Sequence, residues 1–122
     1  MKAIILNTSG ARYIDLPEDS EMQFGRAMQA AIGCRDMGPA GSPDHDHDAY
    51  ADDEGMLTLG EGTSLVRTTF FDEWLPGNIV ITGIDHATGQ LQDCSLTPED
   101  AEAMLVRRTF YSRLSDSPQL TF

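Results

Sequence analysis

The stretch from Trp74 to Thr97 reads WLPGNIVITGIDHATGQLQDCSLT, and it decides the fold. Residues 78–84 are apolar and β-branched, which is typical of a buried strand. Pro76 and Gly77 mark the start of that strand, and residues 85–89 supply turn chemistry before an alternating pattern resumes at Leu91. We therefore expect a buried strand, a loop and a return strand that reaches Cys94.

The amino-terminal segment predicts a second pair of strands. Apolar residues in Lys2–Leu6 and Arg12–Leu16 flank Asn7–Gly10, a loop whose residues tolerate positive φ or bond their own backbone. An opening hairpin is the economical interpretation.

Two helices are expected, one before the central stretch in the sequence and one that begins at its end. The first begins at Asp19 or Ser20, carries an apolar face with three- and four-residue spacing, and stops at Gly33. The second has Thr97 as its cap and Pro98 at its first position, and its pattern predicts a helix to about Leu114. Its apolar stripe consists of Ala103, Val106, Phe110 and Leu114.

The middle of the chain has a different composition. From Asp36 to Glu54 acidic residues, prolines and glycines are frequent, so we expect an acidic loop that is exposed and mobile over Pro39–Asp48. A short strand is predicted at Met56–Leu59, with Tyr50 as the start of its partner. Residues 65–71 fit either a helical turn or a strand.

These elements predict an α+β fold in a single domain over residues 1–114, followed by a tail at 115–122. A small, mainly antiparallel sheet packs against the two helices. A chain of 122 residues is enough for one modest core. Leu120 and Phe122 favour a dimer if they are exposed, although a docked tail fits the sequence equally well, so the oligomeric state stays open.

Composition limits the compartment and the partners. No run approaches the ~20 apolar residues that cross a bilayer, and the apolar start is too short for a signal peptide, so we expect a cytoplasmic protein. Cys34 and Cys94 are interpreted as free thiols, with a disulfide as the alternative. A formal charge of −12 opposes direct binding to nucleic acids or to an anionic membrane.

The order of several short motifs resembles the family called domain of unknown function 3846, small proteins of phages, plasmids and integrative elements. The resembling segments are Met1–Ile5, Ala31–Gly33, Asp53–Leu57, Gly77–Gly83 and Ser95–Glu99. The chain departs from the family pattern at the insertion Pro39–Asp48 and at Gly60–Gly62. The resemblance implies an accessory protein of a mobile element, and it implies no particular activity for this chain.

Together these features favour a protein that is not an enzyme, needs no cofactor and acts by contact with a host or element-encoded protein. In its sharper form it is a DNA mimic with a counter-defence role, which inhibits a nucleic-acid-binding protein by presenting carboxylates to a basic groove. The acids expected to bind that partner are Asp44, Asp46, Asp48, Asp52, Asp53 and Glu54. Negative charge that merely maintains solubility is the simpler alternative.

The run Asp44-His45-Asp46-His47-Asp48 suggests a second class of function, a small-ligand or divalent-metal-binding module. Its spacing imitates the start of a calcium loop, but Ala49 and Gly55 occupy the positions where that loop needs glycine and glutamate. Alternation in an extended segment would also separate the histidines from the aspartates. A solvated charged loop is the default interpretation.

Nucleophilic catalysis is a third class. Cys34 or Cys94 with His86 is the arrangement that the sequence offers, but no orienting third group or oxyanion donor can be identified.

Overall fold

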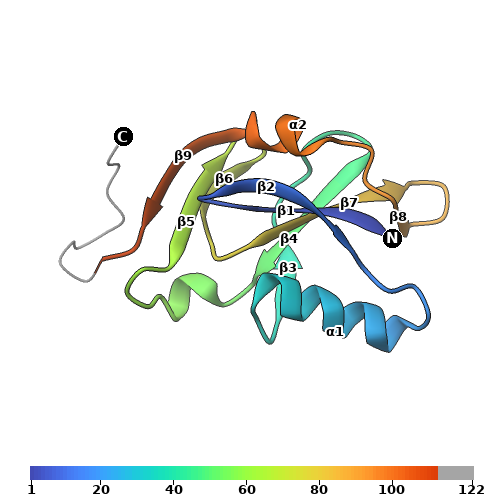
Figure 1. The fold of residues 1–122 in the computed structure, drawn as a ribbon, viewed down its shortest axis with the longest axis horizontal. Coiled ribbons are helices and arrows are strands. Elements are labelled where there is room, and N and C mark those ends of the chain that lie inside the picture. Colours follow the sequence, from blue (N-terminus) through green and yellow to red (C-terminus); the bar gives the residue numbers. More distant parts are fainter. Residues whose placement is uncertain (113–122) are drawn as a thin grey trace.

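The computed structural model describes residues 1–112, which form an α+β fold of antiparallel sheets and two helices (Figure 1). The predicted fold class is confirmed at this level, but the strands form two sheets where one was expected. Within the described residues, neither helix has the length and apolar character needed to span a bilayer.

The larger sheet contains the central stretch and the opening hairpin, both as predicted. Its strand order is β2-β1-β7-β4-β3, and β8 pairs with β7 on the edge that β1 occupies, beyond the start of β1. Its strands are β1 (Lys2–Asn7), β2 (Gly10–Asp15), β3 (Met37–Pro39), β4 (His47–Asp52), β7 (Ile79–Asp85) and β8 (Gln90–Gln92). Strand β7 lies in the middle of this order, and it is covered on both faces, which explains why its first five residues are all buried.

The smaller sheet has the order β6-β5-β9 and lies on the left of Figure 1. Its strands are β5 (Ser64–Thr68), β6 (Phe71–Pro76) and β9 (Leu105–Phe110). Strand formation at β5 settles the choice between a helical turn and a strand for residues 65–71.

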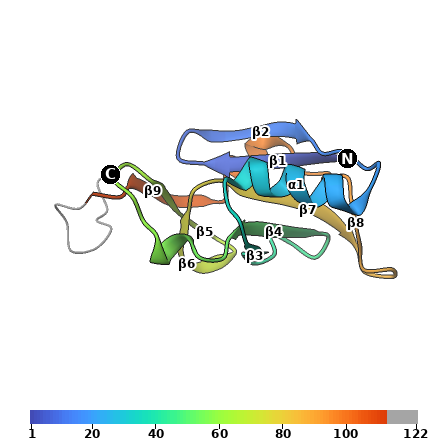
Figure 2. The same cartoon turned by 90° about the horizontal axis from the view of Figure 1, so that it is seen from below.

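Alternation along the strands divides the core into two parts. On one face of the larger sheet, Ala3 and Val80 pack against Met28 and Ile32 of α1 (Glu21–Ile32), which crosses that face in Figure 2. On the other face the larger sheet packs against the smaller one and the short helix α2 (Pro98–Glu102). This second cluster contains Ile4, Leu6, Ile79, Ile81, Val66, Leu75 and Ala101.

The ends of α1 are where the sequence predicts them. The Ser20 side chain accepts a hydrogen bond from the Gln23 backbone N–H, and Gly33 ends the helix in the left-handed conformation with φ 82°.

The predicted long second helix is wrong beyond its first turn. Thr97 and Asp100 form the expected capping box, but α2 ends at Glu102, and β9 follows where a helix was predicted to continue to Leu114. Strand β9 pairs with β5, with Leu65 opposite Thr109, and this long-range pairing gives Val106, Thr109 and Phe110 the extended conformation that they favour. Leu114 and the tail 115–122 lie outside the described residues.

The acidic middle of the chain is more ordered than predicted. Strands β3 and β4 pair as a hairpin, and the backbone of Ala40 bonds to Ala49, so most of Pro39–Asp48 belongs to or adjoins the sheet. The strand predicted at Met56–Leu59 is instead a 3-10 turn, η1 (Gly55–Leu57). Tyr50 lies within β4, whose sheet partners are β3 and β7.

Candidate functional site: an acidic groove and a buried histidine

A groove of about 380 Å³ lies between the β3–β4 hairpin, η1 and β6. Asp52, Asp53 and Glu73 are its acidic lining residues, and no lysine or arginine lines it. Its large apolar lining residues are Met56, Leu57, Phe71, Trp74 and Leu75. Leu57 is 86% exposed, which is unusual for leucine in a folded chain. The groove therefore combines negative charge with apolar and aromatic surface.

Asp53 and Glu73 are the most available acids of this groove. Both are exposed, and neither forms an ion pair with any other part of residues 1–112. The Asp53 carboxylate lies where a Cβ on Gly38 would stand, so the absence of a side chain at Gly38 leaves room for it. Asp52 accepts a hydrogen bond from the Glu54 N–H at 3.0 Å, which shapes the turn after β4.

The structure separates the six acids that the sequence predicts for partner binding. Asp52, Asp53 and Glu54 lie at the end of β4, and the first two line the groove. The other three lie at the start of β4 or before it: Asp44, Asp46 and Asp48. None of these three lines the groove, and an extended chain from Asp46 to Asp53 covers about 23 Å.

Two of the acids near the start of β4 are engaged in local structure. Asp48 accepts a hydrogen bond from the Ser42 hydroxyl at 2.8 Å. Asp44 accepts one from the Asp46 N–H at 2.9 Å and lies against the ring of His47. These contacts give the loop before β4 a defined set of hydrogen bonds.

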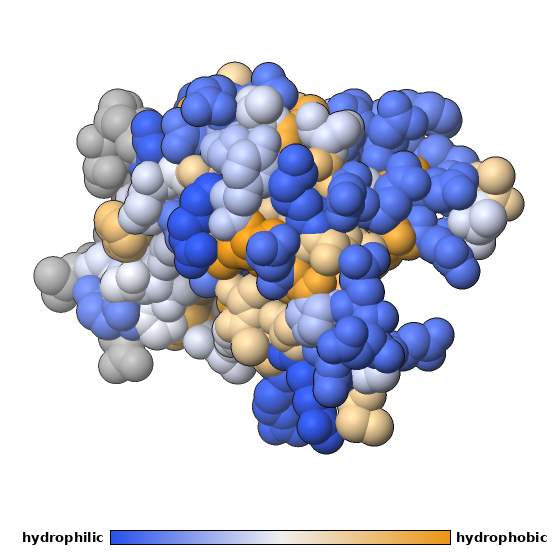
Figure 3. All heavy atoms as spheres, turned by 45° about the vertical axis from the view of Figure 1, so that its right-hand side comes forward, coloured by the Kyte–Doolittle hydropathy of each residue, from blue (hydrophilic) through white to orange (hydrophobic). Residues whose placement is uncertain are grey.

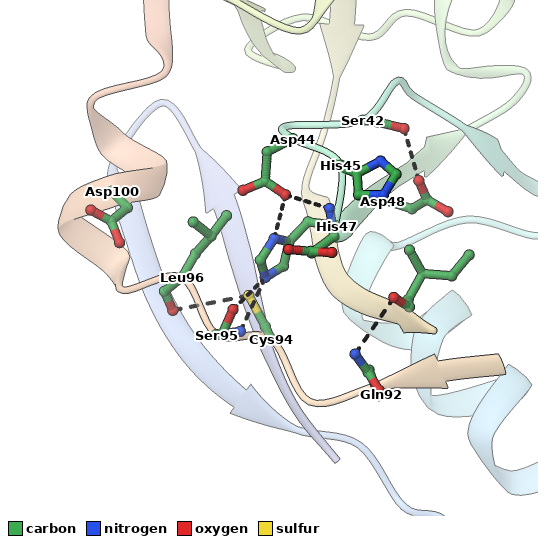
Figure 4. Close-up of polar contacts among 12 residues, drawn as sticks. Ser42, Asp44, His45, His47, Asp48, Gln92, Cys94, Ser95, Leu96 and Asp100 are labelled. Atoms are coloured by element: carbon green, nitrogen blue, oxygen red, sulfur yellow. Dashed lines mark hydrogen bonds and ion pairs between the residues drawn. The ribbon is translucent and has the colours of Figure 1, made fainter. Parts of the chain in front are cut away.

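His47 is the centre of a second arrangement, in which a buried imidazole joins two distant segments (Figure 4). Its ring is 3% exposed. Nδ1 lies 2.7 Å from Oδ1 of Asp44, and Nε2 lies 3.1 Å from both the backbone nitrogen and Oγ of Ser95. Ser95 is exposed and lies in the segment between β8 and α2.

The tautomer of His47 follows from these partners. The Ser95 backbone N–H can only donate a hydrogen bond, so the Nε2 that receives it must carry the lone pair. In the neutral ring Nδ1 then carries the proton and donates it to the Asp44 carboxylate.

Asp44 is held in its charged form. Burial alone would raise the pKa of its carboxyl, but the hydrogen bonds from the His47 ring and the Asp46 N–H outweigh burial and bring the pKa below its ordinary value.

The other histidines form a separate contact. The rings of His45 and His86 stack with centroids 4.5 Å apart, and His86 Nε2 hydrogen-bonds to the His45 carbonyl oxygen. Within residues 1–112 there is no group of three or more His, Cys, Asp or Glu side chains placed to hold a metal ion. The aspartate–histidine run thus divides between a buried and an exposed imidazole.

Neither cysteine forms a hydrogen bond with His86 in the described part of the chain. The Cys94 thiol is 1% exposed and lies 4.0 Å from the Leu96 carbonyl oxygen, and burial raises its pKa. Burial, with Asp52 and Asp36 nearby, also raises the pKa of Cys34. Both thiols are free, as interpreted from the sequence.

A second hollow, of about 410 Å³, lies between the start of α1 and β8. Its lining includes the apolar side chains of Met1, Phe24 and Leu91 and the acids Glu18 and Glu21. Figure 3 shows this side of the molecule with hydrophilic side chains on both rims of an open notch. Glu18 accepts a hydrogen bond from the amino terminus at 3.2 Å, so one of the two acids of this hollow is already paired.

The sequence analysis did not identify Glu73, Trp74 and Phe71 as site residues, because the aromatic residues around Glu73 suggested a core segment. It also missed Ser95, which is an ordinary serine in sequence and meets His47 only through the sheet. An exposed acid between two aromatic residues was the available signal for the groove.

Comparisons with protein-family models, with curated proteins and with solved structures find no match to this chain. The resemblance to domain of unknown function 3846 therefore stays a prediction.

Proposed function

We propose that this chain is an accessory protein that binds a basic segment of a partner protein in the groove between β4, η1 and β6, where it acts by contact and not by catalysis. The observation that carries the proposal is the coincidence of Asp53 and Glu73 with exposed apolar side chains in one groove that lacks basic residues. Interfaces with Arg- or Lys-bearing segments combine these two kinds of surface, because apolar contact supplies affinity and complementary charge supplies orientation and on-rate.

The groove selects cationic partners for two reasons. Its carboxylates attract positive charge, and the formal charge of −12 strengthens that attraction at longer range. Trp74 and Phe71 also offer ring surface on which an arginine guanidinium can stack. A nucleic-acid strand, which carries negative phosphates, is repelled by the same features.

A partner that binds nucleic acid through a basic surface fits this chemistry. We propose that the chain occupies such a surface in the cytoplasm and competes with the polynucleotide, as a DNA mimic encoded by a mobile element would. The acids Asp44, Asp46 and Asp48, at the far end of β4, would extend the contact beyond the groove and contribute mainly to the rate of association.

Binding of a defined probe tests the proposal. The probe is a fluorescein-labelled peptide of alternating arginine and leucine, with an alternating glutamate and leucine peptide for comparison. Fluorescence anisotropy should detect the first peptide at low ionic strength and not the second. Raising salt to about 0.5 M should weaken binding, because exposed charges are screened within a few ångströms at that concentration.

Charge-matched variants locate the binding site. Asp53→Asn with Glu73→Gln removes two charges in the groove, whereas Asp19→Asn with Glu99→Gln removes two exposed charges elsewhere. We expect the groove variant to raise Kd by about tenfold, since two exposed charge contacts are worth roughly 0.2 to 1 kcal/mol each. Equal weakening by both variants would mean that net charge alone attracts the peptide, and the groove proposal would then be wrong.

A further inference from the structure

We propose that Ser95, His47 and Asp44 form a nucleophilic relay in which the Ser95 hydroxyl reacts with small activated acyl and phosphonyl groups. The relay is independent of the acidic groove and lies on another part of the larger sheet, where the segment after β8 meets the turn before β4.

The distances satisfy the requirements for activating a serine. A nucleophile needs a base within about 2.6 to 3.2 Å, and that base needs a third group that orients it. Ser95 Oγ lies 3.1 Å from His47 Nε2, and Asp44 Oδ1 lies 2.7 Å from His47 Nδ1. Figure 4 shows the three side chains in this order, with the imidazole between the carboxylate and the hydroxyl.

The protonation state is also the one that general-base chemistry requires. The single lone pair of Nε2 faces both the N–H and the hydroxyl of Ser95, each at 3.1 Å, so the hydroxyl proton moves to Nε2 only as the N–H···N hydrogen bond loosens. The Asp44 carboxylate is ionised at neutral pH and can stabilise the imidazolium that forms. The burial of His47 keeps its ring in one orientation, whereas an exposed imidazole would sample many.

The chemical step is balanced within these three residues and the acyl donor. Ser95 Oγ forms a bond to the acyl carbon, and its proton moves to His47 Nε2. The bond from the acyl carbon to the leaving alcohol breaks, and the alcohol takes that proton from the imidazolium. Water then attacks the acyl-serine by the same route and releases the carboxylic acid.

The substrate class follows from the exposure of Ser95. Its side chain lies at an open surface, and the hollows described above do not include it. The Ser95 N–H is already bonded to His47, so it does not serve as an oxyanion donor. Both features favour small esters with good leaving groups, because such donors need neither a binding pocket nor strong stabilisation of the oxyanion.

Covalent labelling of the whole chain tests the relay directly. A fluorophosphonate reagent is incubated with the folded protein, and the modified residue is identified by peptide mass spectrometry. Attack by Ser95 Oγ forms an oxygen–phosphorus bond, fluoride leaves, and His47 takes the hydroxyl proton. We expect label on Ser95 and none on the other serines of residues 1–112.

Variants distinguish labelling that depends on the relay from the reaction of a serine that has no imidazole partner. Ser95→Ala keeps the backbone N–H that bonds to His47, so it should fold normally and lose the label. Ser42→Ala is the matched control, because its hydroxyl bonds to the Asp48 carboxylate and not to an imidazole, and it should leave labelling of Ser95 unchanged. Asp44→Asn should slow labelling at least tenfold while circular dichroism shows a folded chain.

Acetyl transfer from p-nitrophenyl acetate gives a second readout. The exposed His45 and His86 will hydrolyse this ester at a background rate, so the relay is judged by the acetyl adduct on Ser95 and not by total turnover. The absence of any adduct on Ser95 with both reagents, or equal labelling of Ser95 and Ser42, would overturn the proposal.

Discussion

Oδ1 of Asp44 lies 2.7 Å from Nδ1 of His47, so an exposed carboxylate orients a buried imidazole at the point where β4 begins. The imidazole in turn bonds to Ser95, and the pair therefore connects the loop before β4 to the segment before α2. The charged run Asp44–Asp48, which the sequence alone suggests is a solvated loop, thus makes hydrogen bonds that connect two parts of the fold.

Replacing Asp44 should destabilise the fold. In Asp44→Asn a neutral amide replaces the charged carboxylate that accepts the hydrogen bond of the His47 ring, and a weakened partner for a buried donor costs about 1 to 3 kcal/mol. Urea unfolding should show this loss as a lower midpoint with an unchanged slope. Asp46→Asn is the control, since it leaves the Asp44–His47 contact intact. Equal midpoints for the two variants would contradict the structural role of Asp44.

Asp44 should also make stability depend on pH. Its pKa is lowered in the folded chain, so its contribution is complete above the unfolded pKa of about 3.9 and is lost as pH falls through the folded value. Unfolding followed between pH 5 and pH 2 should show a steeper loss for the parent chain than for Asp44→Asn. Parallel curves would mean that the folded chain does not favour the carboxylate.

The central strand should be sensitive to cavities. Ile81 is fully buried in β7 between the two sheets, and Ile81→Ala should cost about 2 to 5 kcal/mol through lost burial and the cavity that remains. Leu57→Ala removes an apolar side chain that is 86% exposed and should change stability by less than about 0.5 kcal/mol. Thermal unfolding of the two variants measures the contrast.

Gly41 should tolerate no side chain. It has φ 90°, and a Cβ there would meet the backbone carbonyl of Phe70 at the edge of the smaller sheet. Gly62 has a similar φ of 80° with open space around it. Alanine at either position bears the cost of positive φ, about 1 to 2 kcal/mol, and Gly41→Ala should lose a further 1 to 3 kcal/mol, about the cost of overpacking. A difference of zero between the variants would contradict this close approach.

The cysteines should react slowly and at different rates. Burial raises the pKa of both thiols, so alkylation by iodoacetamide should become fast only above the pH of about 8.5 at which an ordinary thiol ionises. Cys34, which is partly exposed, should react before Cys94, which is buried. Mass spectrometry of partly labelled protein resolves the two sites. Rapid reaction of Cys94 near pH 7 would contradict its burial.

Local signals in the sequence predict the first helix, the start of the second and the two hairpins β1–β2 and β7–β8. The caps at Ser20 and Thr97, the stop at Gly33 and the apolar run of β7 are short-range features, and the structure confirms each. Strand β9 could not be predicted in the same way. Its residues fit a helical stripe, and only pairing with β5, about forty residues earlier in the chain, makes them a strand.

The candidate sites depend still more on distant contacts. Asp53 and Glu73 come together because β6 packs beside the β3–β4 hairpin, and their spacing in the sequence carries no sign of this. The contact between His47 and Ser95 likewise requires the alignment of β4, β7 and β8. The sequence predicted the acidic segment that supplies Asp52 and Asp53, but not Glu73 or the apolar side chains that line the groove with them.

Emission from Trp74 tests the proposed groove most directly. Trp74 is the one tryptophan of the chain and lines the groove, so its fluorescence reports on that place alone. We predict that titration with the arginine–leucine peptide, which lacks tryptophan, shifts or quenches the emission in a saturable way, and that the effect falls with added salt and in the Asp53→Asn/Glu73→Gln variant. Saturable anisotropy with no change in Trp74 emission would place the peptide elsewhere and contradict the groove as the binding site.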